Sequence, residues 1–292
     1  MILAVVFALA AAMANAINLM TQHKASIGAP RQVKGWRLAL YLPRQPLWLL
    51  GVAAAVGSFV FQALALHSGP MSVVQPLLVT ELVFVLVLRR VWIRQDVARA
   101  AWASVTVVCV TLGVFLAVGE PTGGHPFPAA KQWLSAGLVF GGAVAVLTLL
   151  GLRGAPARRA AVLAAATGLT ASLEATFLKT ATETLSVSGI GGMLANWPVY
   201  AFIAAIITGA LLQQATLHVG PLSVSQPILV IADPFASIIL SVWLFGEHFT
   251  DSPAKVAIAI VAFAAMAVGV TMLTRTAPQD LTPSKPASPA GS

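Results

Sequence analysis

Long apolar stretches follow one another along most of the chain, separated by short polar gaps. A helix needs about 20 mostly apolar residues to cross a bilayer, and nine stretches meet that length. They run approximately over residues 2–22, 46–67, 70–89, 101–120, 132–152, 160–180, 197–217, 221–245 and 254–274. The pattern predicts an all-α polytopic membrane protein with about nine transmembrane helices.

The composition agrees with a membrane protein and argues against a soluble one. Hydrophobic residues make up 58% of the 292 positions and charged residues only 9%, whereas soluble domains average about 25% charged residues. The net charge of +8 does not indicate nucleic acid as a partner, because the basic residues lie in short gaps and form no basic domain. The single cysteine, Cys109, allows no intrachain disulfide.

Lysine and arginine are unevenly divided between alternate gaps. In polytopic membrane proteins such residues concentrate in cytoplasmic loops. One set of gaps, with the C-terminal tail, holds Lys24, Arg31, Lys34, Arg37, Arg44, Arg89, Arg90, Arg94, Arg99, Arg153, Arg158, Arg159, Arg275 and Lys285. The other set holds Lys131, Lys179 and Lys255. We therefore expect the N-terminus outside, the C-terminus inside, and residues 276–292 as a disordered cytoplasmic tail.

An internal repeat is the most informative feature of the sequence. Residues 62–79 recur as residues 213–230, with a Gly-Pro pair, a Gln-Pro pair and several neighbours preserved. A weaker match places Asn15 against Glu174. Helices one to four thus correspond to helices six to nine, and the unpaired fifth helix inverts the second half, as in inverted-repeat transporters. We expect a first repeat over residues 1–125, a connecting helix over 126–156 and a second repeat over 157–275.

Three carboxylic residues lie within predicted spans: Glu81, Glu174 and Asp233. Each ionised carboxylate in hydrocarbon costs roughly 2.5–3.5 kcal/mol on insertion scales. The three side chains should therefore face the protein interior and be protonated, hydrogen-bonded or paired with a cation. Apart from Arg89 and Lys255 at the very ends of their spans, the only basic residue in a span is Lys179, which could extend outward from its helix end. Such a core favours protons, metal cations or organic cations. Carboxyls that merely bond neighbouring helices are the structural alternative.

Polar residues on the first and sixth helices offer further ligands. Asn15, Asn18 and Gln22 are spaced so that they share one helix face. Under inversion, Asn15 and Glu174 would approach the midplane from opposite sides and could face each other. Hydrogen bonding between helices is the alternative role for such residues.

Two glutamines and three prolines complete the candidate site. Gln75 and Gln226 are equivalent positions of the repeat, and we expect both as polar ligands. Pro76, Pro227 and Pro234 should break helices three and eight and free backbone carbonyl groups. Broken helices often line the binding sites of transporters, although kinks also serve packing alone.

The sequence also resembles a known family. The run Gly-Pro-Leu-Ser-Val-Ser-Gln-Pro at 220–227 is followed by Asp233-Pro234-Phe235 and by Leu244-Phe245-Gly246-Glu247. This combination resembles the drug/metabolite transporter (DMT) superfamily, EamA-like, over nearly the whole chain to about residue 274. More narrowly, it resembles the nine-helix branch that includes NIPA-type magnesium transporters. This sequence departs from the family's usual plan of ten helices, because residues 23–45 and 181–196 stand in place of the second helix of each half.

The residues and the resemblance together predict a secondary transporter. It would move a small metabolite, drug or cationic solute by alternating access, coupled to protons or cations. A second hypothesis is a pathway for magnesium or another divalent cation, with Glu81, Glu174 and Asp233 as metal ligands; otherwise we expect no metal site. A third is a non-transporting membrane scaffold. No Walker motif or catalytic residue set indicates an enzyme, and no cofactor is expected. The expected partners are a small-molecule or ion substrate and the lipid bilayer, and a homodimer stays open. The expected location is a bacterial plasma membrane.

Overall fold

The computed structural model describes residues 1–27, 45–92, 94 and 96–276. Within these residues, nine helices are long and apolar enough to cross a membrane, which confirms an all-α, multi-pass membrane protein. The nine candidate spans are Ile2–Gln22, Pro46–Ser68, Met71–Trp92, Arg99–Gly119, Ala130–Gly151, Pro156–Ala195, Trp197–Val219, Ser223–Phe245 and Pro253–Arg275. The basic residues predicted for the gap at 28–44, and the predicted tail after Thr276, lie outside the described residues.

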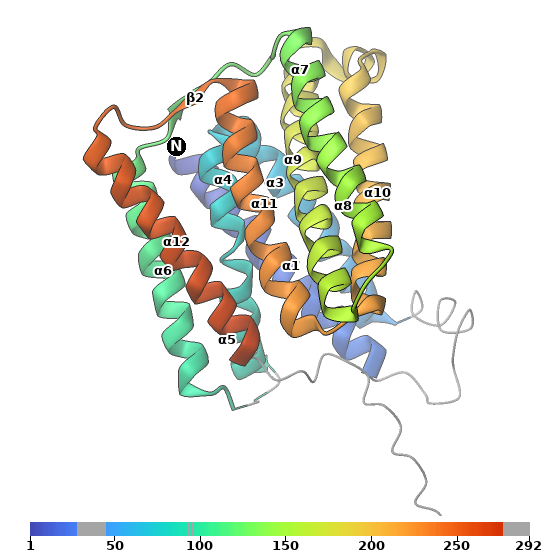
Figure 1. The fold of residues 1–292 in the computed structure, drawn as a ribbon, viewed down its shortest axis with the longest axis vertical. Coiled ribbons are helices and arrows are strands. Elements are labelled where there is room, and N and C mark those ends of the chain that lie inside the picture. Colours follow the sequence, from blue (N-terminus) through green and yellow to red (C-terminus); the bar gives the residue numbers. More distant parts are fainter. Residues whose placement is uncertain (28–44, 93, 95, 277–292) are drawn as a thin grey trace, which may run out of the picture.

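The helices form a single bundle, and a short strand pair lies at one end of it (Figure 1). The first half contains α1 (Ile2–Ile27), α3 (Pro46–Ser68), α4 (Met71–Leu78), α5 (Glu81–Trp92) and α6 (Arg99–Gly119). The connecting span consists of α7 (Ala130–Ala136), the π-helical η2 (Gly137–Gly141) and α8 (Gly142–Gly151). The second half contains α9 (Pro156–Ala195), α10 (Trp197–Val219), α11 (Leu222–Phe245) and α12 (Pro253–Thr276). Strands β1 (Thr122–Gly123) and β2 (Glu247–His248) pair antiparallel.

Proline marks where several of these helices begin. Pro46 and Pro156 occupy the first turns of α3 and α9. A proline there loses nothing, because the first N–H groups of a helix have no intrahelical partner. The third span, by contrast, contains Pro76 in its interior and divides into α4 and α5, with a turn at Val79 and Thr80. The predicted break near Pro76 is therefore present.

Two predicted boundaries differ from the structure. Pro227 and Pro234 lie inside a continuous α11, so no helix break follows either proline. Residues 181–195, expected as a polar connection, continue α9 instead. The interruption in α9 falls at Gly189, whose φ of 66° and ψ of −174° are not helical. Glycine tolerates that positive φ because it has no Cβ. The Thr and Ser residues of this segment are helical. The polarity of the segment alone did not indicate a helix.

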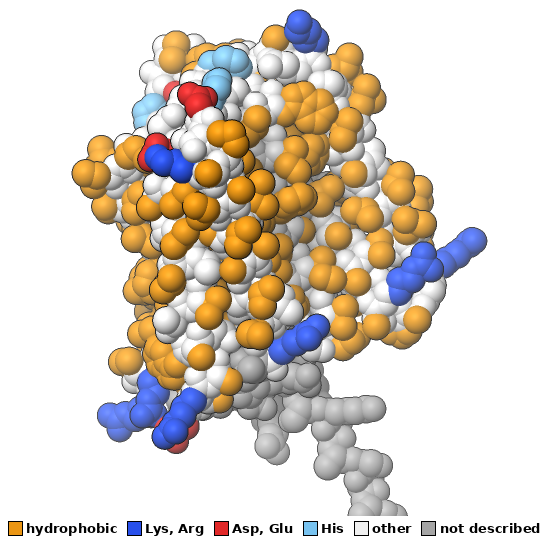
Figure 2. Space-filling model, turned by 60° about the vertical axis from the view of Figure 1, so that its left-hand side comes forward, with side chains coloured by type: hydrophobic (Ala, Val, Ile, Leu, Met, Phe, Trp, Pro, Cys, Tyr) orange, Lys and Arg blue, Asp and Glu red, His pale blue; other side chains and the backbone are white. Residues whose placement is uncertain are grey.

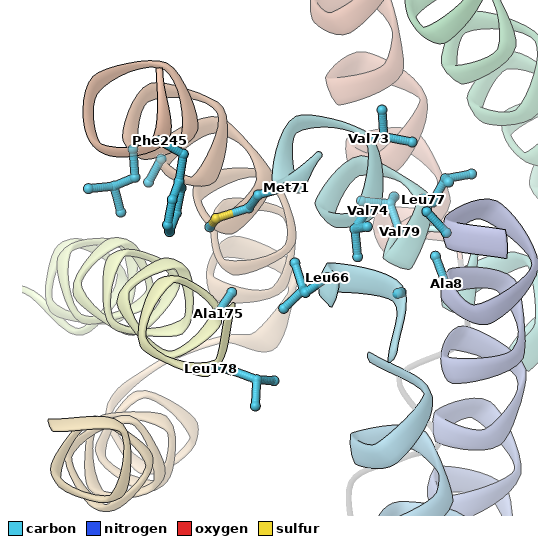
Figure 3. Close-up of a cluster of buried hydrophobic side chains, with 14 of the residues drawn as sticks. Ala8, Leu66, Met71, Val73, Val74, Leu77, Val79, Ala175, Leu178 and Phe245 are labelled. Carbon is cyan, nitrogen blue, oxygen red and sulfur yellow. The ribbon is translucent and has the colours of Figure 1, made fainter. Parts of the chain in front are cut away.

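Equivalent helices pack in the same way in the two halves. In the first half, α1 packs along α3 and against α4 and α5; in the second, α9 packs along α10 and against α11. The two halves meet where α6 packs along α12 and α4 packs against α11. The largest hydrophobic cluster lies at this junction. Figure 3 shows Met71 and Leu66 of the first half beside Ala175 and Phe245 of the second.

The two Gly-Pro turns make matching contacts. A Cβ added to Gly69 would lie 2.6 Å from the Cβ of Ala4 on α1, and one added to Gly220 would lie 2.8 Å from the Cβ of Ala160 on α9. Both distances are shorter than real Cβ contacts, so both positions need glycine. Each turn thus packs closely on the first helix of its own half.

The start of α4 and the end of α11 lie at the same end of the bundle, because Glu247, which follows α11, accepts a hydrogen bond from Met71 N. With 24 residues, α11 is about 36 Å long, so it begins at the opposite end. Hydrophobic side chains cover the middle of the molecule, as lipid contact requires. Lysine and arginine are concentrated toward one end of the view and histidine toward the other (Figure 2).

Candidate functional site

A hydrogen bond in the middle of the bundle joins Asn15 of α1 to Glu81 of α5. Asn15 Nδ2 donates to Glu81 Oε2 over 2.7 Å, and both side chains are partly buried. Glu81 is the first residue of α5. Its carboxylate therefore lies beside the positive end of a helix dipole, where negative charge is stabilised.

The break before Glu81 is maintained by Thr80. Its backbone N–H and its Oγ1 both donate to Leu77 O, over 3.0 and 2.6 Å. These bonds close a tighter turn than an α-helix has, so α5 starts anew at Glu81. The discontinuity thus presents a fresh helix N-terminus within the candidate span.

Two further amides extend the Asn15–Glu81 pair into a polar row along α1. Asn18 Nδ2 donates to Asn15 Oδ1 over 3.3 Å, and Gln22 Nε2 donates to Asn18 Oδ1 over 2.6 Å. The predicted shared face of these residues is therefore confirmed. The row leads from Glu81 toward the C-terminal end of α1.

Gln75, the predicted ligand on α4, is 2% exposed, and its Nε2 has no hydrogen-bond partner in the described structure. An unsatisfied buried amide costs about 1–3 kcal/mol, which a bound acceptor would recover. Its repeat equivalent, Gln226, is partly buried on α11. The binding roles of both residues stay predictions.

The second group of acids lies where α9 meets α11. Glu174 and Asp233 are close enough to interact electrostatically, and Ser237 Oγ donates to Asp233 Oδ1 over 3.1 Å. Glycines make room on both sides of the pair. A Cβ on Gly209 would lie 2.3 Å from Glu174 Oε1, and one on Gly168 would lie 2.6 Å from the Cβ of Ala232 and 3.1 Å from Asp233 N.

Asn15 and Glu174, which were expected to face each other, have different partners, so their facing each other stays a prediction. Asn15 bonds Glu81 within the first half, and Glu174 neighbours Asp233 within the second. The two pairs are equivalent under the repeat, since Asn15 matches Glu174, and Glu81 lies within one position of the match to Asp233. Among the described residues, the three carboxyls do not come together in one metal-binding group.

Glu247 is a buried acid to which sequence reasoning assigned no role. It is 1% exposed and accepts hydrogen bonds from Met71 N at 2.7 Å, Ser72 N at 2.9 Å and Ser72 Oγ at 2.6 Å. Lys179 Nζ lies 3.0 Å from its Oε1. Lys179 therefore does not extend outward as expected; it is 7% exposed and also donates to Gly69 O over 3.2 Å.

The sequence does carry a signal for Glu247. Val91-Trp92 followed by Asp96 recurs as Val242-Trp243 followed by Glu247, and the shift equals that between the two Gly-Pro turns. An acid at this position of both halves, just beyond a helix end, indicates a conserved place in the repeat. The prediction overlooked it because both acids lie outside the hydrocarbon stretches.

A cavity of about 310 Å³ lies next to Lys179, which contacts Glu247. Its lining includes Gly69, His125, Lys179 and Glu183. His67 Nδ1 lies 3.2 Å from Glu183 Oε1 at its edge. Lys179 belongs to the lining of the cavity, whereas no residue of the Asn15–Glu81 or Glu174–Asp233 pairs does.

Comparison with known proteins finds one relative of similar length. An uncharacterized protein of Corynebacterium glutamicum is 29% identical over 250 residues, which covers 85% of this chain and 86% of that protein. No family model and no solved structure matches the chain. The similarity therefore extends over most of both chains.

Proposed function

We propose that this chain is a secondary transporter of the DMT superfamily, EamA-like, that moves a small metabolite, drug or cationic solute by alternating access. The observation that carries the proposal is the presence of a polar pair in each half: the hydrogen-bonded Asn15 and Glu81 in one, and the electrostatically interacting Glu174 and Asp233 in the other. Polar and ionisable groups inside a membrane span are costly and mark ion or substrate pathways. Here they lie at equivalent places of two related halves.

The proposal includes an inverted arrangement of the halves. Its support is that α4 begins and α11 ends at one end of the bundle, although both follow a Gly-Pro turn in the sequence. Equivalent helices that run in opposite directions allow the two halves to exchange shapes. In that exchange the access path opens at one membrane face and closes at the other. We place the N-terminus outside, the C-terminus inside, and the protein in a bacterial plasma membrane.

The two pairs differ in their chemistry and hence in what they would hold. Glu174 of α9 and Asp233 of α11 are two interacting carboxyls, and Ser237 of α11 donates a hydrogen bond to Asp233. Like charges so close in apolar surroundings repel, and a proton or cation between them removes the repulsion. We assign coupling to this pair. Glu81 already has an amide donor, and with Gln75 and Asn18 it would bind the solute.

Reconstitution tests the proposal. Proteoliposomes loaded with a pH-sensitive dye would receive ethidium, a mixture of neutral amino acids or Mg²⁺ in separate experiments. We expect proton movement driven by an organic solute, and its loss in the Glu174→Gln and Asp233→Asn variants. Flux that depends on Mg²⁺ alone would favour the divalent-cation pathway instead. If alanine at all three acids changed no flux while the fold was kept, the result would favour the hypothesis of a non-transporting scaffold.

A further inference from the structure

Glu247 ties the second half to the first turn of α4. A helix leaves its first N–H groups without intrahelical partners, and the carboxylate of Glu247 accepts from those of Met71 and Ser72. Its negative charge also lies at the positive end of the α4 dipole. Lys179 adds a charge-assisted contact from α9. The group therefore joins three segments, from α4, from α9 and from the β2 strand.

The backbone around Glu247 is shaped for this position. Gly123 pairs with Glu247 across the two strands, and Gly124 has a φ of 100°. A Cβ at Gly124 would lie 2.9 Å from Glu247 Cγ. His125 N also donates to Phe245 O over 2.7 Å. The strand pair thus directs the carboxylate inward and covers it from solvent.

The equivalent contact is absent at the other end of the bundle. Asp96, the repeat equivalent of Glu247, has a side chain that is 97% exposed and is paired with Arg90. The equivalent helix start is that of α11, where Ser223 corresponds to Ser72. The ion pair that the structure gives Asp96 is with Arg90, at an exposed side chain, and not with the first turn of α11. The start of α4 is therefore held by a buried carboxylate, whereas the equivalent acid in the first half lies exposed.

We propose that Glu247, Lys179 and the first turn of α4 form a gate at this end, and that Asp96 forms the matching gate at the other end by binding the first turn of α11. The two gates alternate: when Glu247 leaves α4, Asp96 moves onto α11. The structure has the Glu247 gate closed, which is why the cavity above Lys179 stops short of the polar pairs. This inference rests on the proposed alternating access.

Cysteine accessibility tests the gate without knowledge of the substrate. Thr176 is the probe position: it is fully buried, it lies one turn before Lys179, and its Oγ1 lies 3.8 Å from Met71 Sδ. In a Cys109→Ser background, Thr176→Cys would be exposed to a membrane-impermeant maleimide. Intact cells and inside-out vesicles present the two faces in turn, so the result does not depend on the predicted orientation.

We expect slow labelling of the parent and at least tenfold faster labelling after Glu247→Gln, from the face that carries the cavity. Adding Asp96→Asn should slow that raised rate at least threefold, because the open state then loses its opposite gate. An unchanged rate after Glu247→Gln overturns the gate, and an unchanged rate after Asp96→Asn overturns its alternation. Labelling needs no flux, so failed transport assays would count against the proposed function alone.

A milder pair of variants covers the case in which Glu247→Gln does not fold. Ser72→Ala removes one donor to Glu247 and keeps both backbone donors. We expect it to speed labelling at Thr176→Cys threefold or more, from the same face. Ser223→Ala, the equivalent change at α11, serves as the matched control and should not speed labelling. Equal rates in both variants would overturn the gate.

Discussion

Asn15 of α1 donates a hydrogen bond to Glu81 of α5 in the first half, and Glu174 of α9 interacts electrostatically with Asp233 of α11 in the second. In each half, a polar side chain on the first helix lies near an acid on the span that follows the Gly-Pro turn. We propose that a duplication set this placement and that divergence set the chemistry, since an amide in one half corresponds to a carboxyl in the other. A transporter with two such sites can assign one to the solute and one to the coupling ion.

The first prediction concerns the Asn15–Glu81 pair. Glu81→Gln keeps an oxygen that can accept from Asn15 Nδ2, so its free energy of unfolding should change by less than about 1 kcal/mol. It removes the charge, and solute flux in proteoliposomes should fall at least tenfold. Asn15→Ala instead leaves a carboxylate without its donor and should cost about 1–3 kcal/mol. Thermal unfolding and flux measure the two effects; full flux in Glu81→Gln would remove Glu81 from the site.

The second prediction separates two close glycines. At Gly168, a Cβ would meet Ala232 and the α11 backbone, so Gly168→Ala must push two helices apart. We expect a loss of about 1–3 kcal/mol, as for other overpacked positions. At Gly209, the obstacle is the carboxyl end of Glu174, which can swing away. Gly209→Ala should therefore keep most of the stability but lower coupled flux.

A matched control for both glycine variants is Gly57→Ala. Gly57 lies inside α3 with nothing within 4 Å of an added Cβ. Alanine there should stabilise the helix by about 0.5–1 kcal/mol. Melting temperatures of the three purified variants in detergent give the comparison. If the Gly168→Ala variant had the same melting temperature as the Gly57→Ala variant, the close approach of α9 and α11 would be disproved.

Sequence patterns predicted the helices well because apolar length is a strong signal. Each of the nine stretches overlaps one of the nine candidate spans. The repeat matched helices that pack in the same way, since α1 packs along α3 and α9 packs along α10. The failures have physical causes. Proline was expected to break α11, yet a long apolar helix tolerates Pro227 and Pro234 when its neighbours pack around it. Polarity suggested a connection at 181–195, but threonine and serine there return hydrogen bonds to the helix backbone, as Thr184 does to Thr180 O.

The sequence indicated the polar residues of the candidate site but not which of them lie next to each other. Asn15, Glu81, Glu174 and Asp233 were all recognised, since ionisable groups in apolar stretches are conspicuous. Which acid meets which amide depends on how helices rotate against each other, and spacing on one helix does not determine that. Glu247 was missed for a different reason. Its importance comes from burial by the strand pair, and nothing local in the sequence predicted those strands.

The third prediction is energetic and concerns Lys179 and Glu247. Both side chains are buried, with 9% and 0% exposure, so removing one charge leaves the other without its partner. Lys179→Met should cost about 3–5 kcal/mol. The double variant Lys179→Met with Glu247→Gln should be more stable than Lys179→Met alone, because no buried charge then remains. A double-mutant cycle of unfolding free energies measures the coupling; additive effects would show that the two groups do not interact.

The last prediction decides whether the halves are inverted. Ser68 and Val219 are equivalent positions just before the two Gly-Pro turns, and both are partly exposed. The length of α11, about 36 Å, separates its start from the end where α4 begins. In a Cys109→Ser background, Ser68→Cys should react with an impermeant maleimide on intact cells, and Val219→Cys only in inside-out vesicles. Pre-blocking with a permeant maleimide controls for leakage. Reaction of both cysteines from one face would disprove the inversion, and with it the paired gates.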